Sequence, residues 1–169
     1  MNTAIKKIRT DKYSLLKEVI TTKNISTLFQ PIFNLEDNTV FGHEALCRGP
    51  ENSEFYSPLP LFSTAEELGL LYPLENLAME TAIRRFTEFQ LDTKLFINLS
   101  PRIINEPGFA KGQTRRLVKH LELQPSQIVF EITERSSIKD FASFKKALEH
   151  YRQQGFLVAV DDAGAGYSS

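Results

Sequence analysis

The second half of the sequence alternates short apolar strands with helices. Apolar stretches at 94–99, 127–133 and 156–160 are predicted strands, because each is short and bounded by polar or turn-forming residues. The intervening segments 114–121 and 141–151 carry apolar residues at helical spacing. Continuous apolar strands separated by helices are typical of a parallel sheet that is covered on both faces. The sequence therefore predicts an α/β fold.

The first half begins differently. Residues 1–25 are predicted to form an N-terminal basic amphipathic helix, in which six Lys and Arg residues outnumber two acidic ones. A solvated helix face and a surface for an anionic partner both fit that charge. Residues 26–169 are predicted to form one further domain.

Two strand-like segments, 27–35 and 39–46, flank the turn signal Asp37–Asn38 and predict a hairpin. Two helices are expected after it. The first covers residues 61–71, and the second carries one apolar stripe. The stripe consists of Leu74, Ala78, Ala82, Phe86 and Phe89.

Composition excludes several classes of protein. A formal net charge of −1 argues against binding a nucleic acid polymer through a broad basic surface. No apolar run approaches the roughly 20 residues of a membrane span, and the first residues lack the apolar centre of a secretory signal. The single cysteine, Cys47, excludes an internal disulfide and fits a reducing compartment. We therefore expect a cytoplasmic protein.

Polar residues stand at or near the ends of the predicted strands. Asn98, Glu131 and Asp161 are separated by 33 and 30 residues, which matches the length of a strand–helix–strand unit. Glu44 lies in the second strand of the hairpin, and Asp162 follows Asp161. Because the carboxyl ends of parallel strands meet at one edge of a sheet, these side chains are expected to converge there.

A divalent cation would relieve the repulsion among these carboxylates. Glu131 in particular stands within an apolar strand, where an uncompensated charge is costly. A donor set made only of oxygen atoms favours Mg²⁺ or Mn²⁺ over zinc. Simpler explanations exist for each residue: a salt-bridged Glu131, turn residues at 161–162, and an Asn98 that caps the following loop.

Four motifs resemble those of a known family, the EAL domain. They are FQPIFNLEDNTVFGHEALCR (29–48), FINLSP (96–101), VFEITE (129–134) and VAVDDAGAGYSS (158–169). Glu44, Ala45 and Leu46 match the tripeptide that gives the family its name. The motifs occur in the family's order and at similar separations.

This resemblance implies a modified TIM (β/α)8 barrel that hydrolyses the bacterial second messenger cyclic di-GMP to linear pGpG. It implies that Glu44, Asp161 and Asp162 are catalytic, and that two metal ions are bound, with Asp162 at the second. The implied metal ligands are Glu44, Asn98, Glu131, Asp161 and Asp162. The implied substrate contacts are Gln30, Leu46 and Arg48; a guanidinium such as that of Arg48 can bind a phosphate through two hydrogen bonds.

The sequence departs from the family pattern at two places. In the loop after the last strand, Ala163 and Ala165 replace the family's Phe and Thr, and Gly49 stands where an aromatic residue is common. The family's regulatory loop is retained at Gly164, Gly166, Tyr167 and Ser168. These departures leave open an alternative function: a weak or inactive EAL domain that binds cyclic di-GMP as a receptor. A scaffold without a ligand is the third alternative.

The family pattern continues beyond these motifs with a catalytic lysine and further barrel strands. A complete barrel takes about 250 residues, whereas this sequence has 169, so we expect a barrel truncated after about its fifth strand segment. Such a chain is expected to be inactive alone and, with an open sheet edge, to be unstable, aggregate or form a homodimer. An attached sensory or GGDEF domain is a further expectation for the parent protein.

Overall fold

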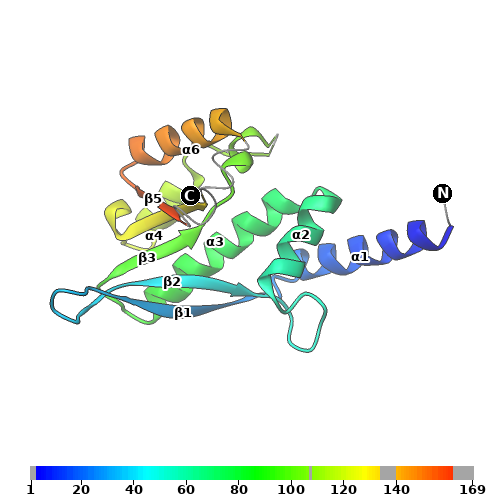
Figure 1. Cartoon of the computed structure of the whole chain (residues 1–169), viewed down its shortest axis with the longest axis horizontal. Coiled ribbons are helices and arrows are strands. Elements are labelled where there is room, and N and C mark those ends of the chain that lie inside the picture. Colours follow the sequence, from blue (N-terminus) through cyan, green and yellow to red (C-terminus); the bar gives the residue numbers. More distant parts are fainter. Residues whose placement is uncertain (1–2, 107, 134–139, 162–169) are drawn as a thin grey trace, which may run out of the picture. The chain divides into compact units, whose positions relative to one another are not determined.

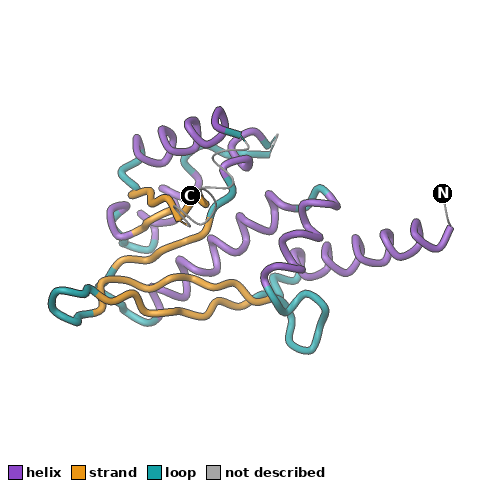
Figure 2. Tube along the Cα trace, viewed as in Figure 1, coloured by secondary structure: helices purple, strands orange, loops and turns teal. Residues whose placement is uncertain are grey.

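Five strands form a single sheet whose order follows the chain (Figure 1). The computed structural model describes residues 3–106, 108–133 and 140–161, and only the backbone of residues 3–9, 133 and 161. The strands are β1 (Ser26–Phe33), β2 (Val40–Arg48), β3 (Lys94–Asn98), β4 (Ile128–Thr133) and β5 (Leu157–Asp161). Helices alternate with strands from β2 onward (Figure 2). The predicted α/β class is confirmed.

The strands from β2 to β5 pair in parallel. Ala45 of β2 lies opposite Ile97 of β3, and Ile97 lies opposite Phe130 of β4. Consecutive residues of β3 are all buried from Leu95 to Ile97, so side chains on both faces of this strand are covered. Burial of both faces explains the continuous apolar character of these strands.

Helix α6 (Phe141–Gln153) covers the strands at the end of the sheet. The rings of Tyr151 and Phe130 lie 4.3 Å apart, and Phe156 packs edge-on against Phe130 at 5.3 Å. Asp140 begins the helix by accepting hydrogen bonds from the backbone N–H and the hydroxyl of Ser143. These hydrogen bonds hold the pKa of the Asp140 carboxyl below its ordinary value.

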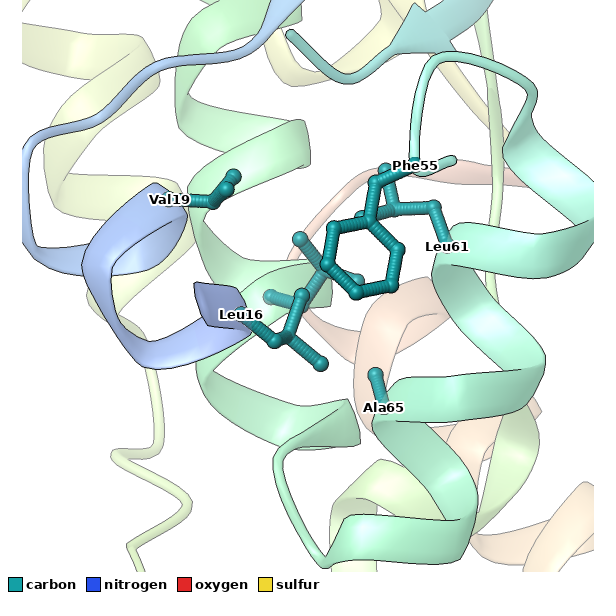
Figure 3. Packing of buried hydrophobic residues seen from close by; sticks show 6 residues of the cluster. Leu16, Val19, Phe55, Leu61 and Ala65 are labelled. Atoms are coloured by element: carbon teal, nitrogen blue, oxygen red, sulfur yellow. The ribbon is translucent and has the colours of Figure 1, made fainter. Parts of the chain in front are cut away.

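The chain divides into two compact units: residues 1–28 with 46–82, and residues 29–45 with 83–169. The first unit contains α1 (Thr3–Thr21), α2 (Pro58–Leu68) and the beginning of α3 (Leu71–Glu88). Its core consists of Leu16, Val19, Phe55, Leu61, Ala65 and Leu74, most of which Figure 3 shows. None of the helices in the described part of the chain combines the length and apolarity needed to cross a lipid bilayer.

The predicted hairpin is confirmed as β1 and β2. Its turn is closed by a hydrogen bond from the Asn34 N–H to the Thr39 carbonyl, and the Asp37 carboxylate accepts from the N–H and hydroxyl of Thr39. Asn38 adopts the left-handed conformation with a φ of 56°, as Asn does more readily than most residues. Among the described strands, β1 lies at one edge of the sheet, and it contains Pro31, which has no amide hydrogen to donate.

Two members of the predicted stripe, Ala78 and Phe89, are not buried, and Ala78 is half-buried. Leu74, Ala82 and Phe86 are buried as expected, but the Phe89 side chain is 55% exposed. α3 ends at Glu88, and Gln90 turns the chain with a φ of 51°. The Phe89 ring instead lies at the surface, edge-on to Phe29, with the Arg85 guanidinium above it.

The core of the first unit can be tested with two adjacent leucines of α1. Leu16 is fully buried, whereas Leu15 is 49% exposed. Leu16→Ala is expected to lower the free energy of unfolding by about 2–5 kcal/mol, because it removes contacts and leaves a cavity. Leu15→Ala is the control and should change it by less than about 0.5 kcal/mol. Urea unfolding followed by circular dichroism measures both; equal effects would contradict the assigned core.

The pairing of β2 with β3 depends on Gly42. A Cβ atom at this position would lie 2.6 Å from the Phe96 ring and 2.8 Å from the Lys94 carbonyl oxygen. Gly42→Ala is therefore expected to destabilise the fold by about 1–3 kcal/mol. Adding Phe96→Leu should restore only part of this loss, since the backbone carbonyl remains. Urea unfolding measures both variants, and wild-type stability of Gly42→Ala would contradict the close approach.

Candidate metal and substrate site

The sheet brings three of the predicted metal ligands to one place. The Asn98 amide nitrogen Nδ2 donates a hydrogen bond to the Glu44 carboxylate oxygen Oε1 at 2.8 Å. Asn98 is also the register partner of Glu131 on the adjacent strand. Beyond this pair, the Leu99 N–H donates to the Glu131 carbonyl at 2.9 Å and extends the pairing of the two strands. Glu44, Asn98 and Glu131 therefore lie on three neighbouring strands, β2, β3 and β4.

The local sequence explains why these polar groups occur there. In β3 the residues from Leu95 to Ile97 are buried, and Asn98 is the first exposed residue of the strand. Glu131 is half-buried, with fully buried Phe130 and Ile132 on either side of it in β4. Its carboxylate oxygen Oε2 is buried and receives no hydrogen bond from the described residues, although the residue makes other contacts. A half-buried carboxylate in this position needs a nearby positive charge or donor.

β5 carries the fourth predicted ligand. Asp161 is the last residue of this strand, and its backbone pairs with Thr133 of β4, two residues beyond Glu131. The side chain of Asp161, the whole of Asp162, and the loop residues Gly164, Gly166, Tyr167 and Ser168 lie outside the described residues. Within the described side chains, no three His, Cys, Asp or Glu residues form a group able to hold a metal ion.

The predicted substrate contacts lie on the hairpin strands. Gln30 is exposed on β1. β2 was expected to end at Leu46 but continues to Arg48, so Glu44 lies inside this strand and not at its end. Leu46 and Arg48 belong to the first compact unit, whereas Glu44 belongs to the second. Arg48 is half-buried, and its Nη1 donates to the Cys47 carbonyl at 2.8 Å.

The sequence did not predict the hydrogen bonds that hold the segment after Asn98. A short 3₁₀ helix at Pro101–Asn105 follows this strand end, and the Asn105 amide donates to the Ser143 hydroxyl, which itself donates to Asp140 at 2.7 Å. The chain after Asn98 is thereby joined to the start of α6. Ser100–Pro101 is the one signal of this turn in the sequence, because Pro favours the first helical position.

The described donors fit a hard divalent cation. Glu44 and Glu131 supply carboxylate oxygens, Asn98 supplies an amide, and no thiolate or imidazole belongs to this group. Oxygen donors of this kind bind Mg²⁺, Mn²⁺ or Ca²⁺ in preference to zinc.

A family model and several known proteins match this sequence. The EAL domain family model matches residues 14–169. The chain is 32% identical over 149 residues to the probable cyclic di-GMP phosphodiesterase PdeI of Escherichia coli K12, covering 84% of this chain and 19% of PdeI. It therefore spans about a fifth of the length of that relative.

Solved structures give the same fold. The EAL domain of FimX from Pseudomonas aeruginosa, bound to c-di-GMP, matches with a TM-score of 0.80 at 23% identity, over 92% of this chain and 64% of that one. BlrP1 of Klebsiella pneumoniae, in a complex with manganese and cyclic di-GMP, matches with a TM-score of 0.74 at 30% identity, over 86% of this chain and 36% of that one. The predicted TIM-barrel-like fold is confirmed, and the chain belongs to the EAL domain family.

Proposed function

We propose that the domain containing this chain is a metal-dependent phosphodiesterase that hydrolyses cyclic di-GMP to linear pGpG. The observation that carries this proposal is the Asn98–Glu44 hydrogen bond beside Glu131, which gathers two carboxylates and an amide on adjacent strands. Relatives named as cyclic di-GMP phosphodiesterases and the BlrP1 complex with manganese and cyclic di-GMP support it.

We assign the metal ligands to the strands from β2 to β5 and to the residue that follows β5. Glu44, Asn98, Glu131 and Asp161 would hold one ion, and Asp162 would contribute to a second. When bound, Mg²⁺ or Mn²⁺ would supply a water of lowered pKa and charge stabilisation at the phosphate. Asn98 keeps Glu44 oriented through the hydrogen bond from its amide nitrogen.

The residues of the hairpin would bind the substrate. Side chains alternate along a strand, so Leu46 and Arg48 are expected on the same side of β2 as one another. The Arg48 guanidinium would donate to phosphate oxygens, Leu46 would cover apolar parts of the guanosine, and Gln30 would donate to or accept from the ligand. Binding through these groups would hold the ligand in a defined orientation.

A receptor function is the second candidate. Ala163 and Ala165 stand in the loop that follows the proposed ligands Asp161 and Asp162, in place of the larger residues typical of the family. Smaller residues at these two positions of the sequence would favour a domain that retains binding by Gln30, Leu46 and Arg48 but has lost efficient turnover. Such a domain would bind cyclic di-GMP and pass the signal to a partner.

The cellular setting is part of this proposal. A single cysteine fits a reducing cytoplasm, the compartment in which we place the reaction. We also propose a homodimer, and a sensory or GGDEF domain attached in the parent protein.

Hydrolysis can be measured with the full-length protein, cyclic di-GMP and added Mg²⁺ or Mn²⁺, with products separated by chromatography. Wild type is expected to form pGpG, and Glu44→Ala is expected to reduce the rate at least about a hundredfold because a metal ligand is lost. Glu36→Ala removes an exposed carboxylate from the hairpin turn and should leave the rate unchanged.

Two results would contradict the proposed phosphodiesterase or its assigned metal ligands. Turnover that is unaffected by Glu44→Ala would contradict the ligand assignment. Binding of cyclic di-GMP by calorimetry, with intact substrate recovered after incubation with metal, would support the receptor function instead.

A further inference from the structure

The segment after Arg48 folds into a closed loop, residues 49–56, which we call the Gly49 loop. The Gly49 N–H donates to the Tyr56 carbonyl at 3.1 Å and closes the loop where β2 ends. Inside it, the Ser53 hydroxyl donates to the Pro50 carbonyl at 2.7 Å and accepts from the Phe55 N–H at 3.2 Å. One hydroxyl therefore joins both sides of the loop.

Gly49 is required by a close approach of the backbone. A Cβ atom at this position would lie 2.2 Å from the Phe55 carbonyl oxygen and 2.9 Å from its carbonyl carbon. A residue with a side chain therefore has no room at this position. The ring that enters the core at this place belongs to Phe55, whose side chain is only 2% exposed.

The loop is anchored to helices α1 and α2. Phe55 packs in the same core as Leu16 of α1 and Leu61 of α2 (Figure 3). The neighbouring residue Glu54 forms an ion pair with Lys12 of α1, with an N–O distance of 2.9 Å. The position of the loop is thus fixed mainly by the buried contacts of Phe55, to which the exposed ion pair adds little.

The core that anchors the Gly49 loop also contacts the end of β2. The Cys47 side chain packs against the core that contains Phe55, and burial raises the pKa of its thiol to about 11. Because side chains alternate along the strand, Arg48 points to the other face. Its guanidinium is held by the Cys47 carbonyl, so movement of the Cys47 backbone would move Arg48 too.

We propose that the Gly49 loop positions Arg48 for phosphate binding, with Ser53 and Phe55 as positioning residues. This inference rests on the proposed function, in which Arg48 binds the substrate. An arginine side chain loses considerable conformational entropy when a ligand orders it. A loop that already holds the neighbouring backbone lowers the entropy that binding must cost.

The first test needs no ligand. Cys47 is the only cysteine in the 169 residues, so labelling with a thiol reagent at pH 8, followed by mass spectrometry, reports how often the end of β2 opens. Ser53→Ala and Gly49→Ala are expected to accelerate labelling of Cys47 by about tenfold. Ser63→Ala is the matched control, because the Ser63 hydroxyl makes a similar contact with the Pro60 carbonyl at 3.3 Å.

The second test is a double-mutant cycle on cyclic di-GMP binding, measured by calorimetry with the full-length protein and Ca²⁺ in place of Mg²⁺. Ser53→Ala is expected to weaken binding about tenfold, and Ser53→Thr, which keeps the hydroxyl, by less than about twofold. In an Arg48→Ala background, Ser53→Ala should have no further effect, because the loop acts through Arg48.

The outcomes distinguish a failure of the proposed function from a failure of the positioning role of the Gly49 loop. If wild type binds no cyclic di-GMP, the proposed function fails, while the labelling experiment still tests the loop. If wild type binds but Ser53→Ala behaves like Ser63→Ala, or if its effect persists in the Arg48→Ala background, the positioning role of the loop is wrong. Thermal unfolding of each variant shows whether it is folded at the temperature of the labelling and binding experiments.

Discussion

The parallel pairing of β3 with β4 is the constraint on which the candidate site depends. With Ile97 opposite Phe130, the next pair is necessarily Asn98 opposite Glu131. A shift of this register by one residue would turn Glu131 to the other face of the sheet and bury it among apolar side chains. The burial of Leu95, Ile97, Ile128 and Phe130 opposes such a shift, so the apolar core also fixes the polar site.

Much of this arrangement could be predicted from local patterns. The strands around Asn98, Glu131 and Asp161 are short apolar runs between helical segments, and their spacing of about thirty residues is that of a strand–helix–strand unit. The hairpin was evident from Asp37–Asn38 between two strand-like segments, because Asn tolerates the left-handed conformation. Because parallel strands end at the same edge of a sheet, the convergence of the polar residues near these ends could be predicted as well.

Features that depend on contacts distant in sequence could not be predicted. The Asn98–Glu44 hydrogen bond joins residues 54 positions apart, and the close approach of Phe55 to Gly49 depends on a core built from α1 and α2. The exposure of Phe89 follows from a left-handed turn at Gln90, which helical periodicity does not show. Periodicity describes a single element, whereas these features arise where elements meet.

Pro31 has a consequence for how the outer strand of the hairpin meets other molecules. An exposed edge strand can act as a template for a foreign strand, and each unpaired N–H strengthens that tendency. Pro31 interrupts the row of donors in the middle of β1, with four residues of the strand before Gln30 and only two after Pro31. In the described sheet, a strand added to this edge could therefore form only a few consecutive hydrogen bonds before it meets Pro31, which has no donor. This edge thus disfavours fibril-like stacking, while the side chain of the neighbouring Gln30 is exposed.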